Sequence, residues 1–296
     1  MATYNGARYL PQQLCSLITQ SMGDWTLYVH DDGSTDGTVA ILEKFAAVDK
    51  RIRLVKDGVS YHNPALNFLH LLQYSTAPFT IFCDQDDIWL DNKLEKMYGV
   101  IAASDNSVPL AVYSNAYVYD ADKCNISGRA TIARPTSLKD VLFMNGGVQG
   151  CAIMFNSKLK DICKDAPEVV AMHDHLVTLS AIVFGKMVYV DWNLMLYRRH
   201  VSTVTGKTYG NKMEKARDFF SNDMAVLDRK HYQAICSFYE KYESLMSSEA
   251  KDIFSDFFKF VGESKIRRFF HVFSGGYRLY GSRVILALKM LIRPLQ

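Results

Sequence analysis

Strand-like and helix-like segments alternate over the first ~200 residues of this 296-residue chain, and this alternation restricts the possible folds more than any other feature. Strand-like runs lie at residues 26–30, 52–55 and 79–83, and helical apolar spacing recurs at 10–18, 36–45, 66–72 and from residue 91. Such alternation with short connections is typical of an α/β fold, here a doubly wound, mixed but mainly parallel sheet flanked by helices. Ligands of such sheets bind beyond the carboxyl ends of the strands, so residues there are candidates for function.

The pattern changes near residues 206–210, where the strand-like runs stop and long helical patterns follow. We therefore expect an α/β domain over residues 1–206 and a helical appendage over 207–296. Residues 264–296 contain no acidic residue, and their cationic side chains alternate with aromatic and aliphatic ones. A basic amphipathic helix is typical of an interfacial membrane anchor, on which Arg278, Lys289 and Arg293 would share one face. Packing on the α/β domain or on a partner subunit is the alternative.

The composition is that of a globular protein, with 49% hydrophobic and 22% charged residues and a net charge of +3. It excludes a disordered or collagen-like chain and gives no argument for nucleic-acid binding. The six cysteines are scattered without a C-x-x-C pair, which favours buried thiols over disulfides or a metal site. Because there is no signal-peptide pattern and no run of 18 apolar residues, we expect a cytoplasmic protein.

Two acidic runs follow strand-like segments. The first is Asp31-Asp32-Gly33-Ser34-Thr35-Asp36-Gly37, in which a tight turn with a helix cap is an alternative to a binding role for Ser34 and Asp36. The second is Asp84-Gln85-Asp86-Asp87-Ile88-Trp89, which places three carboxylates in four residues. Such a dense negative charge suits a hard divalent cation, Mg²⁺ or Mn²⁺, that shares its coordination shell with phosphate oxygens. A solvated acidic turn is the alternative.

Together with Ala2-Thr3-Tyr4-Asn5-Gly6, these runs occur in a recognisable order and spacing. The chain resembles glycosyltransferase family 2, inverting enzymes of the GT-A fold, over roughly residues 1–205. The second run, with its tryptophan, is similar to the bacterial rhamnosyltransferase branch. The resemblance implies a donor-nucleotide site made of Thr3, Tyr4, Asn5, Asp32, Asn67, Asp84 and Arg198. It also implies that Asp84 and Asp86 form the DxD pair, with Asp86 nearest the metal.

Two downstream segments complete the resemblance. Asn145-Gly146-Gly147-Val148-Gln149-Gly150-Cys151 carries glycines that allow close backbone approach, and a plain turn is the alternative. The resemblance implies that Gly147, Gly150 and Trp89 lie beside the acceptor and the donor sugar. Met172-His173-Asp174-His175-Leu176 begins a helical pattern, where Asp174 as a simple N-cap is the alternative. The resemblance implies that Asp174 is the general base of a one-step inversion.

A last motif follows a strand-like segment. Leu196-Tyr197-Arg198-Arg199-His200 is similar to the family's Tyr-Arg-x-His signature, which implies that His200 joins the metal shell and Arg198 faces the diphosphate. Ion pairs with the acidic runs are the alternative for the two arginines. Relatives often carry a basic residue at the position of Leu66, so this chain departs from the family pattern there.

The N-terminal motif should follow a central strand, yet only Met1 and Ala2 precede it. We expect a first strand that is short by about six residues, with an empty slot beside the strand that ends at Asp31.

These observations predict a metal-dependent inverting glycosyltransferase at the inner face of the plasma membrane. We expect the transferred sugar to be rhamnose from dTDP-rhamnose. The expected acceptor is a surface polysaccharide or its lipid-linked precursor, and residues 264–296 are the expected membrane contact. A UDP-sugar donor and a catalytically impaired sugar-nucleotide-binding or assembly protein are the alternatives. A phosphohydrolase is disfavoured because its companion Thr and Lys motifs are not found. The oligomeric state is left open.

Overall fold

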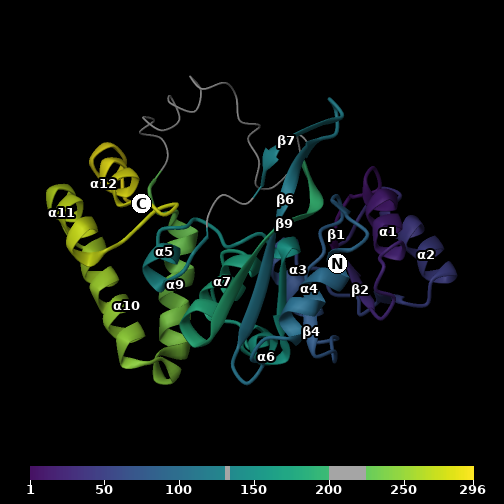
Figure 1. Ribbon diagram of the computed structural model, residues 1–296, viewed down its shortest axis with the longest axis horizontal. Coiled ribbons are helices and arrows are strands. Elements are labelled where there is room, and N and C mark those ends of the chain that lie inside the picture. Colours follow the sequence, from purple (N-terminus) through teal and green to yellow (C-terminus); the bar gives the residue numbers. More distant parts are fainter. Residues whose placement is uncertain (131–133, 200–224) are drawn as a thin grey trace.

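The computed structural model describes residues 1–130, 134–199 and 225–296. Figure 1 shows three regions side by side: a small sheet with helices α1 and α2, a larger central sheet, and a group of C-terminal helices. The candidate site lies where the small sheet meets the larger one.

The small sheet is parallel throughout. Its order is β1-β2-β3, made of β1 (Ala2–Thr3), β2 (Leu27–Asp31) and β3 (Ile52–Val55). Helices α1 (Leu10–Ile18) and α2 (Thr38–Val48) supply the crossovers that parallel strands require, and α3 (Pro64–Leu71) follows β3. The predicted strands at 26–30 and 52–55, and the helices beside them, are confirmed within a few residues.

The larger sheet has the order β4-β8-β6-β9-β5, and β7 pairs with β6 at its edge. Its strands are β4 (Phe79–Ile81), β5 (Ile88–Trp89), β6 (Leu110–Asp120), β7 (Asn125–Arg129), β8 (Ile153–Asn156) and β9 (Lys186–Arg199). Its helices are α4 (Lys93–Ala102), α5 (Leu138–Val141), α6 (Ser157–Lys164) and α7 (His173–Phe184). Here β6 and β9 are parallel and the other described pairs are antiparallel. The mixed α/β architecture is confirmed, but parallel pairing prevails only in the small sheet. Short links such as residues 121–124 allow only antiparallel neighbours.

Residues 1–3 lie beside the carboxyl half of β2. Ala2 pairs with His30 and Thr3 with Asp31, and the amide of His30 donates to the carbonyl of Met1 at 3.1 Å. The expected short first strand is observed, since β1 has two residues and pairs with His30 and Asp31 of β2. The expected empty slot directly beside Asp31 is wrong, because Thr3 fills it. Within the described part of the chain no pair joins β1 to β4, so the two sheets are separate.

The C-terminal helices are α9 (Arg229–Tyr242), α10 (Ser248–Val261), α11 (Lys265–Gly275) and α12 (Arg283–Ile292), with a 3₁₀ turn η2 (Glu243–Leu245) after α9. They share one hydrophobic core with the larger sheet, in which the Phe143 ring lies 5.4 Å from that of Phe257 and 5.3 Å from that of Tyr277. Packing on the α/β part, one of the two alternatives, therefore holds for this region. The expected boundary at 206–210 lies outside the described residues.

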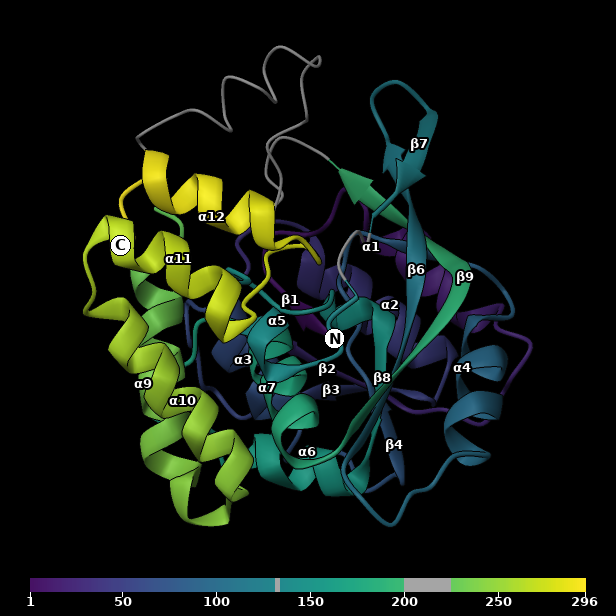
Figure 2. The same ribbon diagram turned by 60° about the vertical axis from the view of Figure 1, so that its left-hand side comes forward.

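The expected cationic face of a single helix is wrong. Gly276, at φ 76°, ends α11 in the left-handed conformation that favours glycine, so the chain turns before α12 begins. Arg278 lies in that turn, Lys289 lies on α12, and Arg293 follows α12 as a buried residue. Figure 2 shows α11 and α12 as neighbouring helices at the edge of the molecule.

All six cysteines are free thiols. Cys83, Cys151 and Cys163 are buried as predicted, whereas Cys15 and Cys124 are exposed. Among the helices in the described ranges, none has the length and apolar character needed to cross a membrane.

Candidate active site between the two sheets

Hydrogen bonds join the three N-terminal motifs into one continuous edge of the site. We call this edge the rim, and it consists of the segments around Tyr4, Asn5, Ser34 and Gln85. The Gln85 side chain binds the Tyr4 backbone twice, with its Oε1 accepting from the Tyr4 amide at 3.0 Å and its Nε2 donating to the Tyr4 carbonyl at 2.9 Å. The amide of Asn5 donates to Ser34 Oγ at 2.8 Å. A Cβ on Gly6 would lie 2.1 Å from Gln85 Oε1, so only glycine permits this approach. Motifs 80 residues apart in sequence are thus brought together.

Asp32 anchors the loop that follows β3. It is buried, and it accepts hydrogen bonds from Ser60 Oγ at 2.9 Å and from the amides of Tyr61 and Asn63. Burial alone would raise the pKa of Asp32, but these hydrogen bonds outweigh it and hold the pKa below its usual value. The predicted contact of Asp32 with a nucleobase would therefore compete with bonds inside the protein.

The other predicted nucleotide contacts in this region differ in accessibility. Thr3 is buried and donates to Asp31 Oδ1 at 2.8 Å, and Asn67 is buried against His30. Tyr4 is 53% exposed and lies at the rim. Within the N-terminal motif, Tyr4 is therefore better placed than Thr3 to meet a ligand.

The second acidic run concentrates negative charge below this rim. Ligand atoms of Asp84, Asp87 and Cys151 lie within 4.8 Å of one another. Burial, followed by the Asp86 charge, raises the pKa of Asp84 to about 6, and burial with the charges of Asp84 and Asp86 raises the pKa of Asp87 well above its usual value. Within the described residues, no N–H or O–H group donates to the buried Asp87 Oδ2. A carboxylate cluster of this kind fits a divalent cation with oxygen ligands.

Sequence reasoning missed Lys93 and Cys151 in this cluster. Lys93 is buried, its Nζ donates to the Cys151 carbonyl at 2.6 Å, and it lies 3.8 Å from the centre of the Trp89 ring. Burial lowers the pKa of Lys93 to about 8, although nearby Asp87 and Asp84 oppose this shift. Trp89, predicted to lie beside the sugar, is buried under Lys93 and supports the acidic run from within. No local sequence pattern marks Lys93, because its burial depends on the packing of α4 against β6 and β8.

Arg198 fastens the acidic run to α1. Its Nε donates to the Asp86 carbonyl at 2.6 Å, its Nη2 donates to Gln12 Oε1 at 2.6 Å, and its amide donates to Asp87 Oδ1 at 3.1 Å. The guanidinium, predicted to face the diphosphate, is thus committed to the protein. His200, the predicted third metal ligand, lies outside the described residues.

Asp174 lies in the first turn of α7, where Met172 is the N-cap, so the capping alternative is not observed. Burial, opposed by the His175 amide and reinforced by the Asp84 charge, raises the pKa of Asp174 to about 7. Its Oδ1 atom is buried without a hydrogen-bond partner. A carboxyl group with a pKa near neutrality is suited to accept a proton at physiological pH.

The glycine-rich segment approaches the protein itself. It ends in the 3₁₀ turn η1 (Gly150–Ala152), and a Cβ on Gly147 would lie 2.2 Å from the Asp174 carbonyl oxygen. A Cβ on Gly150 would lie 2.5 Å from His173 Nε2. The close approach that these glycines permit is therefore to the start of α7, and it sets the position of Asp174.

The two histidines that flank Asp174 lie in different surroundings. His173 packs against the rings of Phe68 and Phe82, and His175 packs against that of His231. Burial lowers the pKa of both to about 3, so both are neutral at physiological pH.

Comparisons with known proteins agree with this arrangement. The sequence profile of "Glycosyl transferase family 2" matches residues 1–161. The chain is 27% identical over 234 residues to the "dTDP-rhamnosyl transferase RfbG" of Shigella flexneri, covering 73% of this chain and 77% of that protein. It is 34% identical over 100 residues to the "UDP-Glc:alpha-D-GlcNAc-diphosphoundecaprenol beta-1,3-glucosyltransferase WfgD" of Escherichia coli, covering 32% of this chain and 36% of that protein.

Among solved structures, S. aureus TarS in complex with UDP-GlcNAc matches with a TM-score of 0.52 and 17% identity, covering 83% of this chain and 72% of that chain. This likeness shows a shared fold. The matched family profile covers the rim, the acidic run and the glycine-rich segment that positions Asp174. The chain therefore belongs to glycosyl transferase family 2.

Proposed function

We propose that the protein is an inverting transferase that moves rhamnose from dTDP-rhamnose to a hydroxyl group of a glycan, with Asp174 as the general base. The observation that carries this proposal is the Asp174 carboxyl group, which is partner-free at Oδ1, has a pKa near neutrality and lies within electrostatic reach of the acidic run. In the reaction Asp174 takes the proton of the acceptor hydroxyl as its oxygen bonds to the anomeric carbon. The bond from that carbon to the nucleoside diphosphate breaks, and the diphosphate leaves with the electron pair.

Mg²⁺ or Mn²⁺ is the proposed cofactor, held by Asp84 and Asp86 with Asp87 behind them. The fit rests on the clustered carboxylates of Asp84 and Asp87, a buried Asp87 oxygen without an N–H or O–H partner in the described part of the chain, and the raised pKa of Asp84. A bound cation would offset negative charge on the departing diphosphate. Lys93 and Arg198 hold the acidic run in place from below.

The donor is the finer part of the proposal. The similarity to a dTDP-rhamnosyl transferase over most of both chains supports rhamnose. A UDP-sugar is the second candidate, because the similarity to WfgD, whose name specifies UDP-Glc, spans 32% of this chain. A panel of sugar nucleotides with Mn²⁺ and a glycan acceptor tests both. We expect release of dTDP from dTDP-rhamnose, and the absence of nucleoside diphosphate release with every donor and acceptor would refute the transferase proposal.

The remaining alternative is a sugar-nucleotide-binding protein without transferase activity. Leu66 supports this alternative, because this half-exposed residue of α3 occupies the position at which relatives often carry a basic residue. Calorimetric binding of donors in parallel with the activity panel separates the two. Binding without turnover favours the alternative, whereas turnover that is lost in Asp174→Asn favours the enzyme.

We further propose that α11 and α12 contact an anionic membrane surface, where a lipid-linked acceptor would be presented. Each helix carries one apolar stripe with the spacing i, i+4, i+7: Ile266, Phe270 and Phe273 on α11, and Val284, Leu288 and Leu291 on α12. Ile266 and Phe270 are 68% and 65% exposed. Exposed apolar stripes on neighbouring helices without acidic residues suit the boundary between head groups and acyl chains.

Vesicle flotation tests this contact with the full chain. We expect the protein to float with phosphatidylglycerol vesicles more than with phosphatidylcholine vesicles, and to lose flotation in the double variant Phe270→Glu, Leu288→Glu. Leu245→Glu is the matched control, because Leu245 is 69% exposed but lies in η2, outside both stripes. Equal flotation of the three proteins would rule out the contact.

A further inference from the structure

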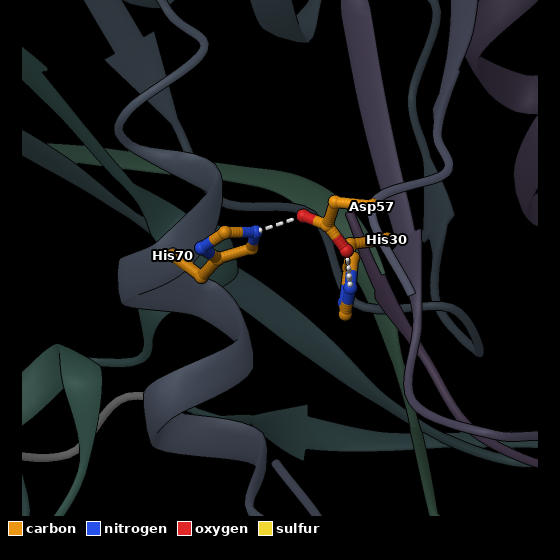
Figure 3. A group of neighbouring side chains, drawn as sticks. All are labelled: His30, Asp57 and His70. Carbon is orange, nitrogen blue, oxygen red and sulfur yellow. Dashed lines mark hydrogen bonds and ion pairs between the residues drawn. The ribbon is translucent and has the colours of Figure 1, made fainter. Parts of the chain in front are cut away.

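Three side chains from separate elements converge beside the rim, and none of them belongs to the acidic run. Figure 3 shows His30 of β2 and His70 of α3 on either side of Asp57, which follows β3. His30 Nε2 lies 3.3 Å from Asp57 Oδ1, and His70 Nε2 lies 2.6 Å from Asp57 Oδ2. The ligand atoms of all three lie within 4.8 Å of one another.

The orientation of His30 is fixed by its other ring nitrogen. Nδ1 lies 2.8 Å from Asn67 Oδ1, and the Asn67 amide is oriented by its Nδ2, which donates to the His30 carbonyl at 3.4 Å. Nδ1 must therefore carry the hydrogen. The neutral ring then directs the lone pair of Nε2 at a carboxylate oxygen, and this arrangement is repulsive unless a cation, either a proton or a metal ion, lies between them.

We propose that His30 Nε2, the Asp57 carboxylate and His70 Nε2 bind a divalent transition-metal ion of the Zn²⁺ class. Two imidazoles and a carboxylate are a typical donor set for such an ion. Zinc bonds of about 2.0–2.1 Å place tetrahedral ligands roughly 3.3 Å apart, close to the His30–Asp57 separation. The His70–Asp57 contact of 2.6 Å would have to open by roughly 0.7 Å to reach that separation.

The surroundings support ligation by the same three residues. Metal-binding histidines commonly donate their second ring N–H to a fixed acceptor, as His30 does to Asn67, and ligating carboxylates are themselves hydrogen-bonded. Asp57 accepts from Tyr74 Oη at 2.9 Å and from the amide of Val59 at 3.1 Å. The side chains of His70 and Asp57 are 17% and 24% exposed, which leaves an entry path and a fourth position for water.

A metal ion here would fasten the loop after β3 to β2 and α3. That loop begins at Asp57 and supplies Ser60, Tyr61 and Asn63, all of which donate to Asp32. The ion would therefore stabilise one side of the rim. Its binding does not depend on the proposed transfer reaction, so the two proposals can fail separately.

Calorimetric titration of the metal-free full chain with Zn²⁺, in excess Mg²⁺ to occupy oxygen-ligand sites, tests the proposal. We expect one equivalent of Zn²⁺ to bind and to raise the melting temperature. In His70→Asn the affinity for Zn²⁺ should fall by at least about 100-fold, because loss of a ligand costs no less affinity than loss of an outer-shell partner. Co²⁺ in its place should give the visible absorption of a tetrahedral site. His62→Asn is the matched control, since His62 is an exposed residue of the same loop.

Asp57→Asn provides a second variant in case His70→Asn perturbs α3, and circular dichroism verifies that each variant is folded. Equal Zn²⁺ binding by the wild type and the folded variants would overturn the proposal. So would the absence of a binding event, which would leave a protonated His30–Asp57 pair as the explanation of the geometry.

Discussion

Replacement of Asp174 by asparagine should abolish transfer and at the same time stabilise the protein. The asparagine keeps the shape of the side chain but removes its charge and its ability to accept a proton. In its proposed role as general base, Asp174 would contribute about 10²–10⁴-fold to the rate, so kcat should fall by that factor. The stability effect has the opposite sign because the folded protein disfavours the ionised carboxylate.

The magnitude follows from the pKa of Asp174, which burial and the Asp84 charge raise from 3.8 to about 7. Between these values the native state holds a proton that the unfolded chain has released, so the free energy of unfolding falls as the pH rises. A shift of about 3 pH units corresponds to at most about 4 kcal/mol. Asp174→Asn escapes this loss, and its advantage over the wild type should grow by about 2 kcal/mol between pH 5.5 and pH 8.

Urea unfolding at several pH values in the presence of a chelator measures this difference without interference from bound cations. Asp252→Asn is the control, since Asp252 is an exposed carboxylate on α10. The pH dependence of kcat/KM gives an independent measure, because activity should be lost as the pH falls through about 7. A variant that is less stable than the wild type at pH 8, or that retains transfer, would refute the reasoning.

Three further predictions rest on other parts of the structure. Gly147→Ala should lower the free energy of unfolding by about 1–3 kcal/mol and reduce transfer, because the new Cβ would lie 2.2 Å from the Asp174 carbonyl oxygen. Gly99→Ala on α4 is the control. A Cβ there meets no atom within 4 Å, so this variant should be more stable by about 0.5–1 kcal/mol in thermal unfolding. Phe257→Ala should cost about 3–5 kcal/mol and leave a single unfolding transition, because this ring packs in a core shared with the larger sheet. Two separate transitions would contradict that shared core. Asp87→Asn should weaken Mn²⁺ binding by at least about tenfold in calorimetry, since it removes one of the two carboxylates that cluster with Cys151; unchanged affinity would exclude Asp87 from the metal site.

The sequence was most informative where local patterns and chain order suffice. The helices and strands around the small sheet follow from apolar spacing, and the meeting of the motifs after β1 and β2 follows from the rule that carboxyl ends of parallel strands share one edge. The approach of Gln85 does not follow from that rule, because β4 belongs to the other sheet. The lengths and boundaries of β6 and β9 could not be predicted from the sequence pattern. Strand β6 is buried on both faces over most of its length, so its sequence lacks the alternation by which a half-buried strand is recognised.

Side-chain partners were the least predictable part of the site. The resemblance assigned Asp32, Asn67 and Arg198 to the donor, yet each of them makes hydrogen bonds within the protein. Lys93 reads in sequence as a solvated helix residue, and only the packing of α4 against β6 and β8 buries it beside the acidic run. His30, Asp57 and His70 form no motif, and β2, β3 and α3 must fold together before they meet.

The charges of the site connect stability with function. Burial and mutual repulsion raise the pKa of Asp84, Asp87 and Asp174 together. Without a bound cation, the free energy of unfolding therefore falls as the pH rises and these three carboxyl groups ionise. A divalent cation bound at Asp84 would reverse the sign of the nearest charge that acts on Asp174 and would therefore lower the pKa of Asp174. The ionised form of Asp174 would then be more populated with the cation than without it. The proposed cation would in this way both relieve the repulsion that destabilises the fold and prepare Asp174 to accept a proton.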